Sequence, residues 1–247
     1  MNSRPTHGPT RPVSTVDSPL EWIDGQPFFR GLKVDHGAVE VAGRRFQVAR
    51  LRDAADLLDD PEFAARFVER DIAPYGLEIW PASFLLAQYV LVAGSGAGAS
   101  AIELGCGVGL VSLAAAARGW DILATDCDPV ALQFAKYNAE VNSLRLRGFD
   151  VLNWHTPQIT ERFERIFAAD VLYQLVDHEP LLLCVDALLV PGGRAVIADP
   201  YRSVADRRPT LALKAGFRVD VQESSAMGLT GEIRGRLLVM ERGSTPA

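Results

Sequence analysis

Short apolar runs alternate with segments of helical hydrophobic spacing through the second half of the chain. The runs that we expect to form strands cover residues 100–104, 121–126, 145–150, 165–170 and 193–199. The segments that we expect to form helices cover residues 82–93, 110–119, 129–142, 179–190 and 204–216. Because strands that alternate with helices pair in parallel through crossovers, this pattern predicts an α/β fold with a doubly wound sheet.

The last two expected strands, residues 217–222 and 235–242, follow each other without a helix between them. Strands joined in this way form a hairpin and run antiparallel. The chain therefore predicts a mostly parallel sheet that contains an antiparallel last strand.

The front of the chain has a different pattern. Residues 38–43 and 44–51 read as a short hairpin, and residues 53–71 read as helical in two pieces, with Pro61 in the first turn of the second piece. Residues 1–19 are rich in Pro, Ser and Thr and lack the apolar centre of a secretory signal. We expect a disordered leader at 1–19 and a single domain at 20–247, made of a small N-terminal cap segment (20–75) and a Rossmann-like core (76–247).

Composition narrows the functional classes. The 247 residues are 48% hydrophobic and carry a formal net charge of −6, which suits one α/β domain and argues against a nucleic-acid surface. The longest apolar stretch, 84–102, is interrupted by Gln88 and by a Gly/Ser cluster, which argues against a membrane span. We expect a cytoplasmic monomer.

Cysteine and histidine spacing gives no sign of a disulfide framework or a metal site. The three cysteines have no paired spacing, and the four histidines form no cluster with ligand spacing. The thiols therefore suggest a reducing compartment, and we expect no bound metal.

The strand at 100–104 ends in the glycine cluster "ELGCGVG", residues 103–109. Its glycines lie at 105, 107 and 109, and position 110 is Leu, so the dinucleotide pattern GxGxxG fails. Alternating glycines allow a ligand to approach the backbone closely, and Glu103 places a carboxylate at the strand end. S-adenosylmethionine, which has no phosphate, suits this loop better than a pyrophosphate does.

Carboxylates also follow the next strands. Asp126 lies 21 positions after Gly105, where a ribose diol could bind it, and Asp150 is placed to accept from an adenine amino group with Trp154 close by. Asp170 ends the fourth strand beside the expected reaction centre. Since the carboxyl ends of parallel strands meet at one edge of a sheet, where open α/β sheets bind ligands, these residues predict a ligand site there.

These segments together resemble a known family. "ELGCGVGL", "TDCDP", "FDVLNW" and "ADVLYQ", in this order, look like the class I, seven-β-strand, S-adenosylmethionine-dependent methyltransferases. The Trp-Pro in "YGLEIWPASFLLAQYV" is similar to the methyltransferase-like protein-lysine methyltransferases, including the kind that modifies the electron-transfer flavoprotein β subunit. The resemblance covers about residues 75–199 and implies a seven-stranded sheet whose last strand is antiparallel.

The resemblance also implies roles for individual residues. Those expected around the methionine part of the cofactor are Glu103, Gly105, Cys106, Gly107 and Gly109. Those expected at the ribose, the adenine and the remaining cofactor wall are Asp126, Cys127, Asp150, Val151, Ala169 and Trp80. Asp170 and Tyr173 are expected to face the nucleophile, with Asp170 as a recognition group for a lysine ammonium, because a carboxylate raises the pKa of an amine and so opposes its deprotonation.

Several alternatives stay open. The acceptor could be a protein lysine or a small molecule methylated on nitrogen or oxygen, and a cofactor-binding protein without catalysis is a third hypothesis. His178 is expected to be a solvent-exposed residue at a helix start rather than a base. The segment "DPYR", residues 199–202, is expected to be a loop at the sheet edge from which Tyr201 or Arg202 could touch a substrate.

Overall fold

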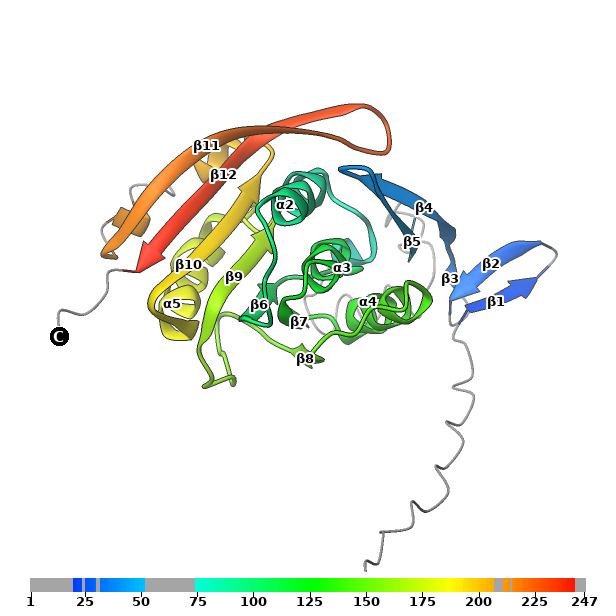
Figure 1. Ribbon diagram of the computed structural model, residues 1–247, viewed down its shortest axis with the longest axis horizontal. Helices are drawn as coiled ribbons and strands as arrows, with labels where there is room; N and C mark the ends of the chain where they lie inside the picture. Colours follow the sequence, from blue (N-terminus) through cyan, green and yellow to red (C-terminus); the bar gives the residue numbers. More distant parts are fainter. Residues whose placement is uncertain are drawn as a thin grey trace, which may run out of the picture.

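A seven-stranded sheet forms the centre of the protein (Figure 1). The computed structural model describes residues 20–23, 25–29, 32–51, 74–206, 211–213 and 215–242. The strands of the central sheet are β6 (Ser100–Leu104), β7 (Asp121–Asp126), β8 (Gly148–Val151), β9 (Phe163–Ala169), β10 (Leu189–Asp199), β11 (Phe217–Met227) and β12 (Glu232–Arg242).

The order of strands across the sheet is β11-β12-β10-β9-β6-β7-β8. Strands β6 to β10 pair in parallel, and β12 is antiparallel to both of its neighbours, β10 and β11. The predicted α/β fold, a doubly wound Rossmann-like sheet of seven strands with an antiparallel last strand, is therefore confirmed.

Helices cover both faces of the sheet. Helices α2 (Pro81–Val92), α3 (Leu110–Ala117) and α4 (Pro129–Val141) pack on one face, and α5 (His178–Leu188) packs on the other (Figure 1). Successive residues of a strand alternate between these two cores: Val196 and Ala198 of β10 belong to the first, whereas Ala195 and Ile197 belong to the second. This alternation is the period of two that an extended strand imposes, and both faces are apolar because both are covered.

Some element boundaries differ from the expected ones. Strand β8 begins at Gly148 rather than at residue 145, and α5 ends at Leu188, where β10 begins at once. Pro191, just beyond, cannot donate a helical hydrogen bond, which favours the early end. In the expected helix at 204–216, the described residues form the short 3₁₀ turn η4 (Ser203–Ala205) and a helical stretch at 211–213.

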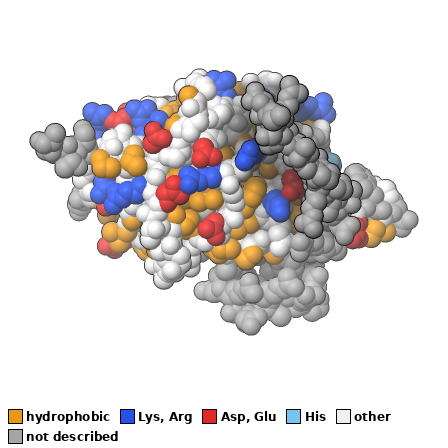
Figure 2. Space-filling view, turned by 60° about the horizontal axis from the view of Figure 1, so that its bottom comes forward, with side chains coloured by type: hydrophobic (Ala, Val, Ile, Leu, Met, Phe, Trp, Pro, Cys, Tyr) orange, Lys and Arg blue, Asp and Glu red, His pale blue; other side chains and the backbone are white. Residues whose placement is uncertain are grey.

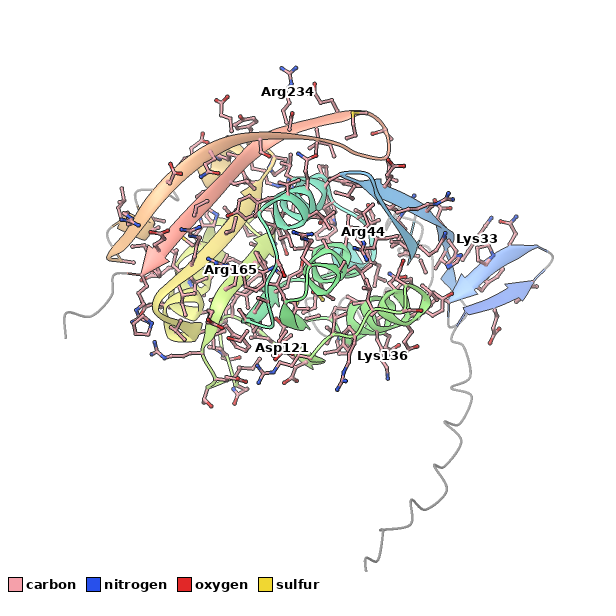
Figure 3. All side chains as sticks on the ribbon, in the orientation of Figure 1. Lys33, Arg44, Asp121, Lys136, Arg165 and Arg234 are labelled. Carbon is pink, nitrogen blue, oxygen red and sulfur yellow. The ribbon has the colours of Figure 1, made fainter. Side chains whose placement is uncertain are left out.

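The N-terminal segment packs beside α4. The expected hairpin is confirmed as β4 (Asp35–Val41) and β5 (Arg44–Arg50), and a small sheet of β1 (Leu20–Ile23), β2 (Gln26–Phe29) and β3 (Leu32–Lys33) was not predicted. Phe29 stacks on Phe134 of α4 with ring centroids 4.0 Å apart, whereas Lys136 points from α4 into solvent (Figure 3). The expected leader at 1–19 and the helical pieces at 53–71 lie outside the described residues, and the division into cap and core stays a prediction.

Surface charge is mixed on the face that Figure 2 shows. Cationic and anionic side chains are interspersed there rather than gathered by sign. Within the described part of the chain, no helix is both long and apolar enough to cross a membrane. The expected cytoplasmic location and monomeric state stay predictions.

Asparagine side chains of α4 bind the hairpin to the core. Asn138 is fully buried; its Oδ1 accepts the amide of Ala49 at 2.7 Å, and its Nδ2 donates to the carbonyl oxygens of Ala49 at 3.0 Å and Val108 at 2.9 Å. One turn later, half-buried Asn142 makes the same pair of bonds with Gln47, at 2.9 and 2.7 Å. Asn138 thus takes the place of a neighbouring strand for Ala49 and links the hairpin to the loop before α3.

We expect Asn138→Ala to lower the free energy of unfolding by about 3 kcal/mol, because it leaves buried backbone groups at Ala49 and Val108 without a partner. Asn142→Ala is the matched control and should cost about 1 kcal/mol, since water can reach the groups that it exposes. Urea denaturation of both variants measures the difference. Equal losses would contradict the role given to Asn138.

Candidate active site

The glycine loop between β6 and α3 folds back onto the segment ahead of α2. Gly107 has a φ of 54°, and a Cβ atom there would lie 2.8 Å from the carbonyl oxygen of Gly76. Gly76 belongs to the 3₁₀ turn η2 (Pro74–Leu77). Only glycine allows this approach at position 107, so the alternating glycines are needed for the backbone path.

Asp126, at the end of β7, holds this loop. Its Oδ2 accepts the amide of Gly107 at 2.8 Å, and its Oδ1 accepts the amide of Asp128 at 2.9 Å. Burial raises the pKa of Asp126 to about 6, and the two backbone hydrogen bonds limit the rise by favouring the charged form. The carboxylate is thus ionised for the most part at neutral pH and lies at the predicted edge of the sheet.

Glu103 lies beneath the loop rather than beside the cavity. Its side chain is 2% exposed and accepts a hydrogen bond from the Ser112 hydroxyl in α3. Burial raises the pKa of Glu103 to about 8, and the bond from Ser112 opposes the rise. The carboxyl group is therefore mainly protonated at neutral pH, and its expected contact with the cofactor stays a prediction.

Aromatic rings form one wall of the site. The Trp80 indole donates to the carbonyl oxygen of Tyr75 at 2.6 Å, and the Tyr75 ring meets the rings of Trp80 and Tyr173 edge-on, with centroids 5.8 and 6.1 Å apart. Burial raises the pKa of Tyr173 to about 12. The Tyr173 phenol is therefore neutral and can donate a hydrogen bond.

Asp170 follows β9 and carries an internal ion pair. Its Oδ1 accepts from Nε of Arg202 at 2.7 Å and forms an ion pair with Nη2 at 2.5 Å, and its Oδ2 accepts the amide of Ala82 at 3.3 Å. The Asp170 side chain is 3% exposed and its φ is +60°, a conformation disfavoured for residues with side chains. The predicted role of Asp170 in holding a substrate cation stays a prediction, and its partner in this structure is Arg202.

A cavity of about 310 Å³ joins these groups. The expected site residues that line it are Trp80, Gly105, Cys106, Gly107, Asp126, Cys127, Ala169, Asp170 and Tyr173. Trp154 lines it as well, so this tryptophan and most of the expected residues are brought together. Among the described residues, no group of three or more His, Cys, Asp or Glu side chains is arranged to hold a metal ion.

Three other expected residues lie outside the lining. Gly109, with a φ of 91°, is the N-cap of α3 and packs toward Ala135. Asp150 and Val151 are exposed at the end of β8, and the Asp150 carboxylate accepts the amide of Val151 at 2.9 Å. Their expected contacts with the cofactor stay predictions.

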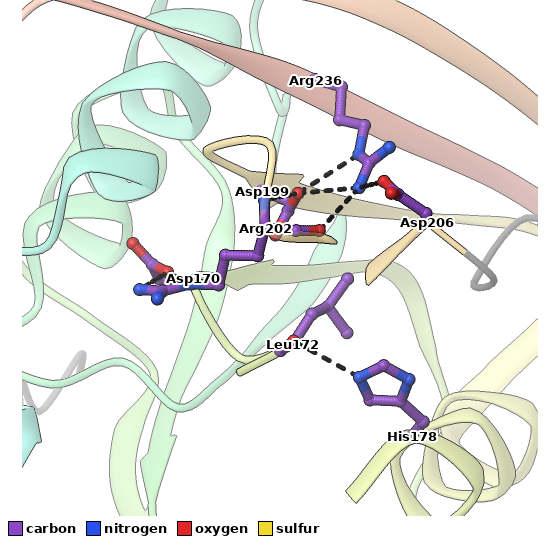
Figure 4. A network of polar contacts seen from close by, with 7 residues as sticks. All are labelled: Asp170, Leu172, His178, Asp199, Arg202, Asp206 and Arg236. Atoms are coloured by element: carbon purple, nitrogen blue, oxygen red, sulfur yellow. Dashed lines mark hydrogen bonds and ion pairs between the residues drawn. The ribbon is translucent and has the colours of Figure 1, made fainter. Parts of the chain in front are cut away.

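The expectation for His178 is wrong in one respect. The residue does begin α5, but it is 3% exposed, and its Nε2 lies 3.3 Å from the carbonyl oxygen of Leu172 (Figure 4). The imidazole of His178 therefore contacts the segment that follows β9 and does not face solvent.

Comparison with known families identifies the chain. A family model described as lysine methyltransferase matches residues 62–210, which is more than half of the sequence. The chain belongs to this lysine methyltransferase family. The family resemblance inferred from the motifs is confirmed.

Relatives of this lysine methyltransferase family member cover part of it. The electron transfer flavoprotein beta subunit lysine methyltransferase of Danio rerio is 32% identical over 136 residues, 53% of this chain and 51% of that protein. A protein-lysine methyltransferase of Mus musculus is 32% identical over 132 residues, 46% of this chain and 52% of that protein. The chain spans about half the length of these curated relatives.

A solved structure shows the same fold. A methyltransferase from Pyrococcus furiosus superimposes with a TM-score of 0.51 at 17% identity, over 70% of this chain and 84% of that chain. At this identity the likeness concerns the fold alone.

Sequence reasoning missed several cavity residues of this family member. They are Tyr75, Gly76, Glu78, Ile79, Ser83, Val108, Leu110 and Asp128. All of them lie within motifs quoted above, although no role was given to them. Asp128 is an N-cap whose Oδ1 accepts the amide of Val130 at 2.8 Å, a role that the "DP" pair at the start of α4 signals. Arg202 was expected at the sheet edge, and the structure places it inside the cavity.

The raised pKa of Glu103 gives a pH-dependent stability. Its value of about 8 in the folded chain exceeds the ordinary value of 4.5, so the folded chain binds this proton more tightly than the unfolded chain does. The free energy of unfolding therefore falls as pH rises from about 4.5 to about 8. Glu103→Gln, which can still accept from Ser112, should be about 3–5 kcal/mol more stable than wild type at alkaline pH and within about 1 kcal/mol of it near pH 5.

Denaturation of Glu103→Gln across this pH range tests the prediction. Glu140→Gln, at an exposed position of α4, is the matched control and should show no gain that depends on pH. A constant difference between Glu103→Gln and wild type at all pH values would contradict the assignment.

Proposed function

We propose that this chain is an S-adenosylmethionine-dependent protein-lysine N-methyltransferase. The observation that carries the proposal is the single cavity in which the glycine loop and Asp126 meet the Asp170–Arg202 pair and the ring of Tyr173. One side of this cavity suits a nucleoside cofactor, and the other side suits an incoming nucleophile. Membership of the lysine methyltransferase family supports an amine as that nucleophile.

The residues of the cavity suit S-adenosylmethionine. The volume of about 310 Å³ lies within the range of about 300–1,000 Å³ that is usual for small-molecule sites. Gly105 and Gly107 line the cavity without side chains, so a ligand can approach their backbone closely. Asp126 offers an ionised acceptor for ribose hydroxyls, and the rings of Trp80 and Trp154 also line the cavity. When bound, the cofactor supplies an electrophilic methyl group on a sulfonium sulfur.

The chain's own residues contribute mainly position and exclusion of water. A lysine side chain must arrive as a neutral amine, because the ammonium has no lone pair to offer. The phenol oxygen of Tyr173 can orient that lone pair by accepting a hydrogen bond from an N–H of the amine, which leaves the lone pair free to attack. Trp80 and Tyr75 line the cavity and exclude solvent from the reacting atoms. Correct positioning of the amine accounts for much of the rate gain in displacement reactions.

Exposed apolar side chains near the cavity favour a protein acceptor over a small molecule. Tyr75 and Tyr173 line the cavity and are 47% and 39% exposed, and Leu175 and Val176, which follow in the chain, are 64% and 70% exposed. Contiguous apolar surface at the mouth of a site is typical of an interaction with a polypeptide.

A labelling experiment tests the class of acceptor. The purified protein is incubated with cell lysate and S-adenosylmethionine labelled in its methyl group, and the products are separated by size. We expect the label in protein bands and in methylated lysine after acid hydrolysis. Label confined to the small-molecule fraction would replace the protein acceptor with a metabolite, and binding without any transfer would favour a non-catalytic cofactor-binding protein.

The role of Asp126 predicts how a cofactor product binds. Asp126→Asn should weaken S-adenosylhomocysteine by about 2 kcal/mol, because the charge-assisted hydrogen bonds to the ribose hydroxyls are lost. Wild-type affinity should also fall below pH 6, near the pKa of about 6 of Asp126, and the variant should lack this step. Calorimetry from pH 5 to 8 measures both effects.

Asp121→Asn is the matched control for Asp126→Asn. It makes the same chemical change on the same strand, but Asp121 begins β7, at the opposite edge of the sheet from Asp126, and does not line the cavity. Its affinity for S-adenosylhomocysteine should stay within about threefold of wild type. If both variants lose affinity equally, Asp126 has no specific role at the ribose.

A further inference from the structure

The carboxylate of Asp170 has little capacity left for a substrate cation. Its Oδ1 accepts from Nε of Arg202 at 2.7 Å and forms an ion pair with Nη2 at 2.5 Å, and its Oδ2 accepts the amide of Ala82 at the start of α2. Both residues line the cavity, and the Asp170 side chain is 3% exposed whereas that of Arg202 is 31% exposed. The group at the acceptor end is thus a neutral ion pair with its guanidinium outermost.

Arg202 is held in this place from several directions. Its guanidinium lies over the Trp80 ring, 5.8 Å from the ring centroid. Its backbone amide donates to Oδ1 of Asp199 at 3.0 Å, and its carbonyl oxygen accepts from Nη2 of Arg236 at 3.2 Å. Arg236, on β12, in turn binds Asp199 and Asp206 (Figure 4). The loop that carries Arg202 is therefore anchored by two neighbouring strands before any substrate arrives.

The backbone at both ends of the ion pair is also strained. Asp170 and Tyr201, which precedes Arg202, each have a φ of +60°. Residues with side chains adopt such conformations mainly where surrounding contacts enforce them, often at functional sites. The backbone conformation and the anchoring contacts together fix the Asp170–Arg202 pair at the cavity.

This pairing changes the electrostatics for an amine. A bare carboxylate within a few ångströms of an amine favours the ammonium form, which cannot attack a methyl group. A carboxylate that is neutralised by a guanidinium exerts much less of this effect. Lysine, with an ordinary pKa of about 10.4, must lose its proton before transfer, so a weaker negative potential favours the reactive form.

We propose that Arg202, held by Asp170 and Trp80, keeps a lysine amine at the reaction centre in its neutral, nucleophilic form. This inference rests on the proposed methyltransferase function. The other titratable and charged groups that face the ion pair or line the same cavity are Tyr75, Glu78, Cys106, Asp126, Cys127, Asp128, Tyr173, Asp199, Asp206 and Arg236.

In the proposed methyl transfer, the lysine amine is the only nucleophile. The ammonium releases its proton to water on entering the site, and the nitrogen lone pair forms the new N–C bond. The electron pair of the broken S–C bond stays on sulfur as a thioether. The product is a methylammonium, and Arg202 then disfavours its retention beside Asp170.

An amine-bearing cofactor analogue tests the proposal without turnover. Sinefungin carries a primary amine on the carbon that replaces the sulfonium, whereas S-adenosylhomocysteine has no group there. The ratio of the two affinities, measured by calorimetry at pH 7.5, reports how the site treats an amine at the reaction centre. A purely structural effect of a substitution weakens both ligands alike and leaves this ratio unchanged.

Two substitutions should move the ratio in opposite directions. Arg202→Gln leaves the charge of Asp170 unpaired, which favours the ammonium form of sinefungin. The ratio of sinefungin affinity to S-adenosylhomocysteine affinity should therefore be about tenfold higher than in wild type, since one unit of pKa corresponds to a tenfold change. Asp170→Asn leaves the guanidinium unbalanced and should disfavour sinefungin by a similar factor. Arg202→Lys keeps the positive charge and should stay near the wild-type ratio.

The outcomes separate this proposal from the proposed function. An unchanged ratio in Arg202→Gln, or a shift of the same sign in Arg202→Gln and Asp170→Asn, overturns the role of Arg202. If Arg202→Gln does not fold, the sign of the shift in Asp170→Asn still decides.

Where wild type labels protein lysines, the rate of Arg202→Gln should recover at alkaline pH. Shifted ratios without any protein labelling would retain the role of Arg202 and reject the lysine acceptor.

Discussion

The hydrogen bond from the Gly107 amide to the Asp126 carboxylate, 2.8 Å long, is the contact on which the site depends. It joins the loops that follow two neighbouring parallel strands, β6 and β7. The same glycine approaches Gly76 so closely that a Cβ would lie 2.8 Å from its carbonyl oxygen, so the segment ahead of α2 closes onto this point. Trp80 and the start of α2 take their places from that closure, and so does the amide that binds Asp170.

Features set by local constraints could be predicted from the sequence. A loop with positive φ at Gly105, Gly107 and Gly109 needs glycine whatever surrounds it, and strand periodicity places Asp126 at the end of β7. The parallel sheet and its final hairpin follow from the order of strands and helices along the chain. Most of the cavity was therefore readable from motifs a few residues long.

Features set by tertiary pairing could not be predicted. Asp170 and Arg202 are 32 positions apart, and Asn138 binds Ala49 from 89 positions away. No local pattern names such partners, and the burial of His178 likewise depends on a loop that passes over it. One signal was available, because Asp170 follows β9 and Arg202 follows β10, and these strands are neighbours in the sheet.

The proposed methyl transfer to an amine has two electrostatic requirements that conflict, and in this proposal each is met at a different end of the cavity. Negative potential favours binding of a cationic sulfonium but also holds an amine nucleophile in its protonated, unreactive form. Asp126 gives an ionised carboxylate at the glycine loop, where burial and two backbone amides set its pKa near 6. At the proposed acceptor end, the carboxylate of Asp170 is paired with the guanidinium of Arg202. Parallel strands bring the carboxylates of Asp126 and Asp170 to the same edge of the sheet. The guanidinium of Arg202 is therefore what makes the Asp170 end of the cavity electrostatically different from the Asp126 end.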